Sequence, residues 1–247
     1  MTNQRYSSRV PVNRRGAFTL WELLAVLVII GIVIALVLPA IQSPRDTGPH
    51  TYCKNNLKQI ALALYNYSDA YGGFPPAYTT DENGKPLHSW RTLILPFLEQ
   101  QALYDSIDLS KPWDDPANAE ALATVVGVYQ CPGAKLEGSL TTYAALVGEH
   151  LFLHPHRSRE INELEDGVST TIAVVEVRPQ DAFPWMQPRD EDINFFETLE
   201  PQSETSHPKG FHALFADGAV RFLSNETPGQ TTTALATIAG GEEVGEY

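Results

Sequence analysis

The sequence predicts an α+β protein in which an N-terminal transmembrane helix precedes an outer domain with helices packed on an antiparallel sheet. Three observations support this class. Residues 18–38 form one continuous apolar segment, residues 51–71 carry apolar side chains at helical spacing, and the C-terminal half has short apolar runs between turn residues. Helices early in the chain and strands later are typical of α+β domains.

The composition limits the classes of protein that this chain can be. Its 247 residues are 43% apolar, which is enough for a sizeable core and excludes a fully disordered chain. Lys and Arg number 17 against 30 Asp and Glu, and the net charge of −13 disfavours binding to nucleic acid. Only two cysteines are present, so neither a disulfide-rich scaffold nor a four-cysteine zinc module is possible.

The apolar segment 18–38 is long enough to cross a membrane. Its 21 residues contain one charge, Glu22, and would span about 30 Å as a helix. Four arginines and no acidic residue precede it, so the positive-inside rule places the N-terminus in the cytoplasm. We therefore expect a single-pass protein of the cytoplasmic (inner) membrane with a periplasmic or extracellular C-terminal domain. A cleaved secretory signal ending near Ala40 is the alternative, although its apolar region would be unusually long.

Residues 14–24, with the sequence RRGAFTLWELL, surround Glu22 with a distinctive pattern. The basic leader, the small residue, Phe-Thr-Leu and the glutamate resemble the processing site of type IV prepilins and type II secretion pseudopilins. The resemblance implies that a prepilin peptidase cuts between Ala17 and Phe18, that the new N-terminus is methylated, and that Glu22 pairs with the amine of a neighbouring subunit. The usual glycine stands one place early, so a cut after Gly16 is the alternative.

Further segments extend this resemblance along essentially the whole chain. The C-terminal part has a signature of His207, nine residues, then Asp217 and Gly218. With this signature the chain resembles the prepilin-like proteins of the domain-of-unknown-function 1559 family, which implies a pilin-like outer domain but supplies no activity. The other segments that carry the resemblance are residues 53–64, 71–76, 90–103, 129–132 and 166–172, with Glu176.

Local patterns predict the elements that follow the membrane segment. A leader at 1–17 and a transmembrane helix at 18–42 would be followed by a kinked linker at 43–50, rich in proline and glycine, and by an outer domain at 51–247. Within that domain we expect a helix over 51–71. Its buried stripe would consist of Leu57, Ile60, Ala61, Leu64, Tyr67 and Tyr71. Short apolar runs predict strands at 125–129, 141–147 and 171–177.

The signature pair Asp217-Gly218 lies between two alternating runs and predicts a hairpin with a tight two-residue turn. Pairing of Ala216 with Ala219 would place His212 and Arg221 on the polar face. The core face would then carry Phe211, Ala213, Phe215, Val220 and Phe222. Turn geometry therefore explains Asp217 without a catalytic role.

Cys53 and Cys131 both follow the membrane segment, so they fall on the oxidising side of the membrane. An even pair of cysteines there usually forms a disulfide. Two buried thiols are the alternative, because the sequence gives no distance between them.

The remaining candidate ligands do not form a recognisable site. His150, His154 and His156 lack the spacing of a metal motif, and the acidic loops at 81–84 and 190–192 lack the full set of calcium-ligand offsets. No nucleophile or phosphate-binding motif is present. We therefore expect no catalytic site, no metal and no other cofactor.

These observations and the resemblance together imply a non-enzymatic pilin-like or pseudopilin-like subunit of a type IV pilus-like or type II secretion-like assembly. The expected partners are a prepilin peptidase, membrane lipid and other pilin-like subunits, and no nucleic acid. The alternative is a membrane-anchored exported binding module that does not polymerise.

Overall fold

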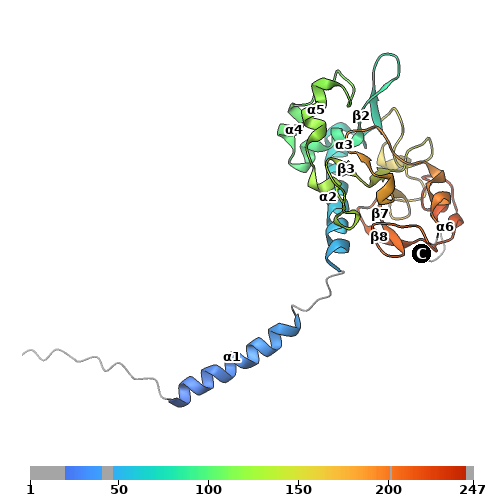
Figure 1. Cartoon of the computed structure of the whole chain (residues 1–247). Helices are drawn as coiled ribbons and strands as arrows, with labels where there is room; N and C mark the ends of the chain where they lie inside the picture. The colour runs from blue at the N-terminus through green and yellow to red at the C-terminus, as the bar shows by residue number, and fades with distance from the viewer. Residues whose placement is uncertain (1–19, 41–46, 201, 243–247) are drawn as a thin grey trace, which may run out of the picture. The chain divides into compact units, whose positions relative to one another are not determined.

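The computed structural model describes residues 20–40, 47–200 and 202–242 (Figure 1). The chain divides into two compact units, residues 1–45 and residues 46–247, and each is described by itself. The first unit contains helix α1 (Leu20–Ala40). The second contains all the other helices and strands of the described residues.

Helix α1 has exposed apolar side chains along its described part, from Leu20 to Val33. Within the described ranges, no helix combines the length and the apolarity that crossing a bilayer requires. The ends of the predicted transmembrane helix, residues 18, 19, 41 and 42, lie outside the described residues, as do residues 43–46 of the predicted linker. The transmembrane helix therefore stays a prediction.

Helix α2 (Thr47–Tyr71) begins inside the segment predicted as linker. The linker prediction was wrong for residues 47–50, because Pro49 occupies the first turn of the helix, where its missing N–H costs no hydrogen bond. The predicted stripe is buried at Leu57, Ile60, Ala61 and Leu64. Tyr71, however, is 67% exposed, since it is the last residue of the helix.

The main sheet has four antiparallel strands in the order β4-β5-β7-β8. Two further sheets have two strands each, β1 with β2 and β3 with β6, and both pairs are antiparallel. The expectation of an α+β fold with antiparallel sheets is therefore confirmed. The strands are β1 (Tyr78–Thr80), β2 (Pro86–Ser89), β3 (Leu140–Thr141), β4 (Tyr143–Ala145), β5 (Ile172–Glu176), β6 (Phe183–Pro184), β7 (Gly210–Phe215) and β8 (Val220–Ser224).

Short helices connect the strands, and α6 lies on the opposite side of the domain from α4 and α5 (Figure 1). The predicted strand at 125–129 was wrong, because a 3-10 helix at Gly127–Tyr129 occupies that segment. The other short helices are α3 (Trp90–Leu93), η1 (Leu95–Leu98), α4 (Gln101–Asp105), η2 (Pro116–Asn118), α5 (Ala119–Ala123), η4 (Pro132–Ala134), η5 (Ile161–Glu163), η6 (Pro179–Asp181), η7 (Ile193–Thr198) and α6 (Gly229–Ala234).

The core has two layers, one on each face of the main sheet. Alternate side chains of a strand point to opposite faces, so Leu214 of β7 packs with α2 while its neighbours Ala213 and Phe215 pack on the other face. All five residues of β5 are buried, because this strand is covered on both faces. The sheet therefore forms the centre of the domain, with α2 on one side.

The hairpin of β7 and β8 forms, but its predicted register was wrong by one residue. Leu214 pairs with Val220 and His212 pairs with Phe222, and Phe215 N–H donates to the Ala219 carbonyl at 2.8 Å. Only Gly218 of the turn has a positive φ, 81°, which fits a three-residue loop instead of the two-residue turn expected. Phe222 consequently lies opposite His212 and is 42% exposed, whereas His212 is buried.

Candidate functional site

The residues of the predicted processing site lie outside the described part of the chain. Ala17 and Phe18 are both in this region. Glu22 lies in the first turn of α1. The cleavage, the methylation and the pairing of Glu22 therefore stay predictions.

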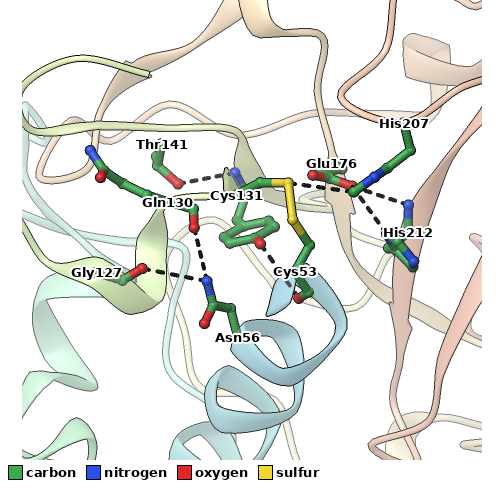
Figure 2. Close-up of a disulfide and its surroundings, with 10 residues drawn as sticks. Cys53, Asn56, Gly127, Gln130, Cys131, Thr141, Glu176, His207 and His212 are labelled. Carbon is green, nitrogen blue, oxygen red and sulfur yellow. Dashed lines mark hydrogen bonds and ion pairs between the residues drawn. A yellow bond between two sulfur atoms is a disulfide. The ribbon is translucent and has the colours of Figure 1, made fainter. Parts of the chain in front are cut away.

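Cys53 and Cys131 form a disulfide that joins α2 to the segment before η4, with a Cα–Cα distance of 5.0 Å (Figure 2). Both cysteines are at most 1% exposed. Asn56, one turn further along α2, donates from Nδ2 to the Gln130 carbonyl at 2.8 Å. The first turns of α2 are thus tied to residues 130 and 131 by one covalent bond and one hydrogen bond.

The signature residues His207, Asp217 and Gly218 do not share a site. His207 precedes β7 and is 1% exposed, whereas Asp217 and Gly218 follow β7 in the hairpin loop. The six residues of β7 separate them by about 20 Å. Asp217 Oδ1 accepts from Ala219 N–H at 2.8 Å, as a turn residue does. The signature therefore marks two local structures at the two ends of one strand.

His207 belongs to a buried cluster with Glu176, the last residue of β5, and His212 in β7. His207 Nε2 lies 3.4 Å from Glu176 Oε2, and His212 Nδ1 lies 3.5 Å from the same oxygen. The backbone N–H of His212 also donates to it at 3.2 Å. Figure 2 shows the three side chains pointing toward one another beside the disulfide, whose Cys131 Sγ lies 3.4 Å from His207 Nε2.

The environment of Glu176 is unusual for a carboxylate, because the residue is only 1% exposed. Burial by itself would raise the pKa of Glu176, but the imidazoles of His207 and His212 outweigh it and hold the pKa below the usual value. Glu176 Oε1 and His212 Nδ1 are buried and make no hydrogen bond in the structure. Such groups are rare in folded proteins and often mark a functional position.

A third histidine, His50 in the first turn of α2, borders this cluster. Its ring centroid lies 4.2 Å from that of His207 and 5.3 Å from that of His212. Among the described residues, two sets of side chains come close enough to share a metal ion. One is His50, His207 and His212, and the other is Cys53, Cys131, Glu176 and His207. The cysteines of the second set are already joined to each other.

Sequence reasoning missed this cluster because its members come from segments far apart in the chain. His50 was not singled out at all, and His212 was expected on a polar face. Glu176 was noted only within the family resemblance. The one local signal was a glutamate at the end of an otherwise apolar strand, residues 172–176.

Among the described residues, the other histidines tested as ligands form no set that could share a metal ion, although the rings of His154 and His156 lie 6.4 Å apart. His150 and His156 are exposed, and His154 Nε2 lies 3.3 Å from Glu149 Oε1. The acidic loops have structural roles. Asp81 Oδ1 accepts from two backbone N–H groups of its own turn, and Asp190 is buried against Arg91.

Comparison with known proteins places the chain in a family. Residues 42–203, about two thirds of the chain, match the family described as Protein of unknown function (DUF1559), and this match ends before His207. Over 54 residues the chain is also 43% identical to Type II secretion system core protein G of Pseudomonas aeruginosa. Those residues are 22% of this chain and 38% of that protein, so the match spans well under half of either. No solved structure matches the chain. The chain belongs to the DUF1559 family of proteins of unknown function.

Proposed function

We propose that this chain is a non-enzymatic, pilin-like subunit, anchored in the cytoplasmic membrane, of a type II secretion-like or type IV pilus-like assembly. The observation that carries the proposal is the segment 14–38, where a basic leader and Phe-Thr-Leu precede Glu22 and a long apolar run. Membership of the DUF1559 family and the similarity to Type II secretion system core protein G support it.

In this proposal residues 1–17 are a cytoplasmic leader that a prepilin peptidase removes before Phe18. The new amine of Phe18 and the carboxylate of Glu22 then lie at similar depths in the membrane. A carboxylate costs several kcal/mol inside an apolar span unless it is paired. A salt bridge between Glu22 of one subunit and the amine of Phe18 of the next offsets this cost in the assembled state.

The outer domain has features that suit the far side of the membrane. Its two cysteines are joined as a disulfide, and such bonds persist in oxidising compartments. The four arginines among the first 17 residues precede the apolar segment, in agreement with a cytoplasmic N-terminus under the positive-inside rule.

Processing is tested by intact mass spectrometry of the full chain extracted from membranes of cells that contain a prepilin peptidase. We expect the loss of residues 1–17 and the gain of one methyl group. A mature chain that begins near residue 41 would instead identify an ordinary secreted protein and overturn the proposal. Ala17→Leu serves as the variant with a blocked site, and Thr2→Ala, far from the site, is its matched control.

Assembly is tested with Glu22→Leu, and with Val26→Leu as a control in the same apolar segment. We expect both variants to insert into the membrane, because Glu22→Leu removes a charge from an apolar span. Only Glu22→Leu should lose incorporation into sheared or cross-linked filaments. If Glu22→Leu assembles as the wild type does, the pairing role is wrong. If neither the wild type nor any variant assembles, the alternative of an anchored binding module that does not polymerise is favoured.

A further inference from the structure

We propose that His50, His207, His212 and Glu176 bind one divalent transition-metal ion, Zn²⁺, which holds the first turn of α2 against the main sheet. This site does not depend on the proposed function, because none of its residues lies in the membrane segment. It departs from the expectation of no metal, which was drawn from the local spacing of other histidines.

Two distances within the cluster, both to Glu176 Oε2, fit a tetrahedral ion. Zinc bonds to nitrogen and oxygen are about 2.0–2.1 Å long, so two ligand atoms of a tetrahedral site lie about 3.3 Å apart. His207 Nε2 and His212 Nδ1 lie 3.4 Å and 3.5 Å from Glu176 Oε2. Each of these two histidine nitrogens therefore stands at about the spacing of neighbouring ligands from Glu176 Oε2.

His50 supplies the fourth ligand from a separate element. Its ligand atom and those of His207 and His212 lie within 4.8 Å of one another. His50 is half-buried in the first turn of α2, with its ring against those of His207 and His212. His50 also stands three residues before Cys53, on the same face of the helix, and the disulfide therefore holds it beside the cluster.

The unsatisfied atoms at this position also point to a ligand. Glu176 Oε1 and His212 Nδ1 are buried without a hydrogen bond. Within the described residues, the ion-pair contacts of Glu176 are to histidines alone and include no lysine or arginine. A positive charge close by stabilises a buried carboxylate. A divalent ion supplies this charge and occupies the free lone pairs.

The surroundings restrict the histidine ring. A Cβ built on Gly133 would lie 2.6 Å from the Ser206 carbonyl oxygen and 3.1 Å from His207 Cε1, so only glycine leaves room for His207 in its present place. Cys131 Sγ lies 3.4 Å from His207 Nε2 on another side. The ring is thus held by its neighbours before any ion binds, which lowers the entropic cost of binding.

The type of ligand indicates the ion and its role. Imidazole nitrogen with carboxylate oxygen suits zinc and its neighbours in the first transition row, whereas calcium and magnesium prefer oxygen alone. Four protein ligands leave no open position for a substrate or an activated water, so the site is structural.

The test uses the full chain in detergent, first treated with a chelator and then titrated with Zn²⁺ against a chromophoric chelator. We expect one Zn²⁺ per chain and a rise in Tm when Zn²⁺ is restored. Co²⁺ in its place should give the intense visible absorption of tetrahedral coordination. Failure to bind a stoichiometric ion, with no change in Tm, would overturn the proposal and leave a cluster held by hydrogen bonds alone.

Variants distinguish the cluster from adventitious surface binding. His207→Ala with His212→Ala should abolish the site, and Glu176→Gln should weaken Zn²⁺ binding by more than the roughly 10–100-fold that the loss of an outer-shell partner costs. His50→Ala removes a ligand at a half-buried position without opening the core, so it keeps the test valid if the buried variants fail to fold. His150→Ala with His156→Ala replaces exposed histidines and is the matched control. If the ion is lost equally in this control, or retained in His50→Ala with unchanged affinity and Co²⁺ spectrum, the assignment is wrong.

Discussion

Arg91 and Asp190 form an ion pair inside the outer domain, with Arg91 Nη1 2.7 Å from Asp190 Oδ1 and side chains 0% and 5% exposed. The same carboxylate oxygen accepts from Trp90 Nε1 at 2.9 Å and from Ala145 N–H at 2.9 Å. The guanidinium also donates to four carbonyls, those of Tyr143, Trp185, Gln187 and Arg189. The pair therefore attaches the loop that contains Asp190 to both α3 and β4.

Removing one member of this pair should destabilise the domain strongly. Asp190→Ala leaves the buried guanidinium of Arg91 without its counter-ion, and we expect a loss of about 3–5 kcal/mol in the free energy of unfolding. The partly exposed pair Arg178 and Asp181 is the control, with side chains 27% and 32% exposed. Asp181→Ala should cost less than about 1 kcal/mol. Urea unfolding measures both, and similar small losses would contradict the role of the buried pair.

The disulfide should make both cysteines unreactive. Thiol labelling of the unreduced, denatured protein should modify neither Cys53 nor Cys131, and full labelling of both would contradict the bond. The bond closes a loop with a sequence separation of 78. The double variant with Ala at both positions should therefore lose on the order of 4 kcal/mol in the free energy of unfolding, through the freedom regained by the unfolded chain.

Glu163 should make stability depend on pH in the acidic range. It contacts Arg157 Nη2 at 2.7 Å and Arg159 Nη1 at 3.0 Å, and the hydrogen bonds from Arg157 chiefly lower the pKa of Glu163 from 4.5 to about 2. A pKa lowered in the folded state stabilises the protein fully above pH 4.5, and this contribution is lost as the pH falls toward 2.

The variant Glu163→Gln isolates this contribution. At pH 7 we expect it to lower the free energy of unfolding by about 1 kcal/mol, because the side chain is 29% exposed and solvent screens the pair. The difference from the wild type should shrink as the pH falls below 4.5. Glu165→Gln, at an exposed position nearby, should have little effect at any pH. If the difference in unfolding free energy between Glu163→Gln and the wild type grows toward low pH, the predicted direction of the pH dependence is wrong.

Gly218 should be required because of its backbone conformation, and not because a side chain at this position would clash with its neighbours. Its φ is 81°, and a Cβ there would meet only Ala61 Cβ, at 3.8 Å. Gly218→Val should cost about 1–3 kcal/mol, because a β-branched residue resists a positive φ. Gly218→Asn should cost less, since asparagine tolerates the left-handed region. If urea unfolding shows that Gly218→Val and Gly218→Asn lose the same free energy of unfolding, steric crowding of the side chain would be the cause instead.

Elements with strong local patterns were predictable from the sequence. The buried stripe of α2 from Leu57 to Leu64 follows helical spacing, and the run at 171–177 contains strand β5. The presence of the β7–β8 hairpin followed from Asp217-Gly218. Its register did not, because Asp-Gly suits both a two-residue loop and a three-residue loop that also includes Ala216, and the local sequence does not decide between them. The segment at 125–129 has apolar content but no decisive period, and the structure there is a 3-10 helix.

The sequence by itself determined the α+β class, the apolar segment with Glu22 and the helix that carries Cys53, because each depends on neighbours along the chain. Only the tertiary structure brought Glu176 between His207 and His212 and placed His50 of α2 beside them. The physical reason is that these contacts arise from strand pairing and from the packing of α2 on the sheet. Such long-range packing has no signature in the local spacing of residues, so the cluster emerges only when the chain is folded.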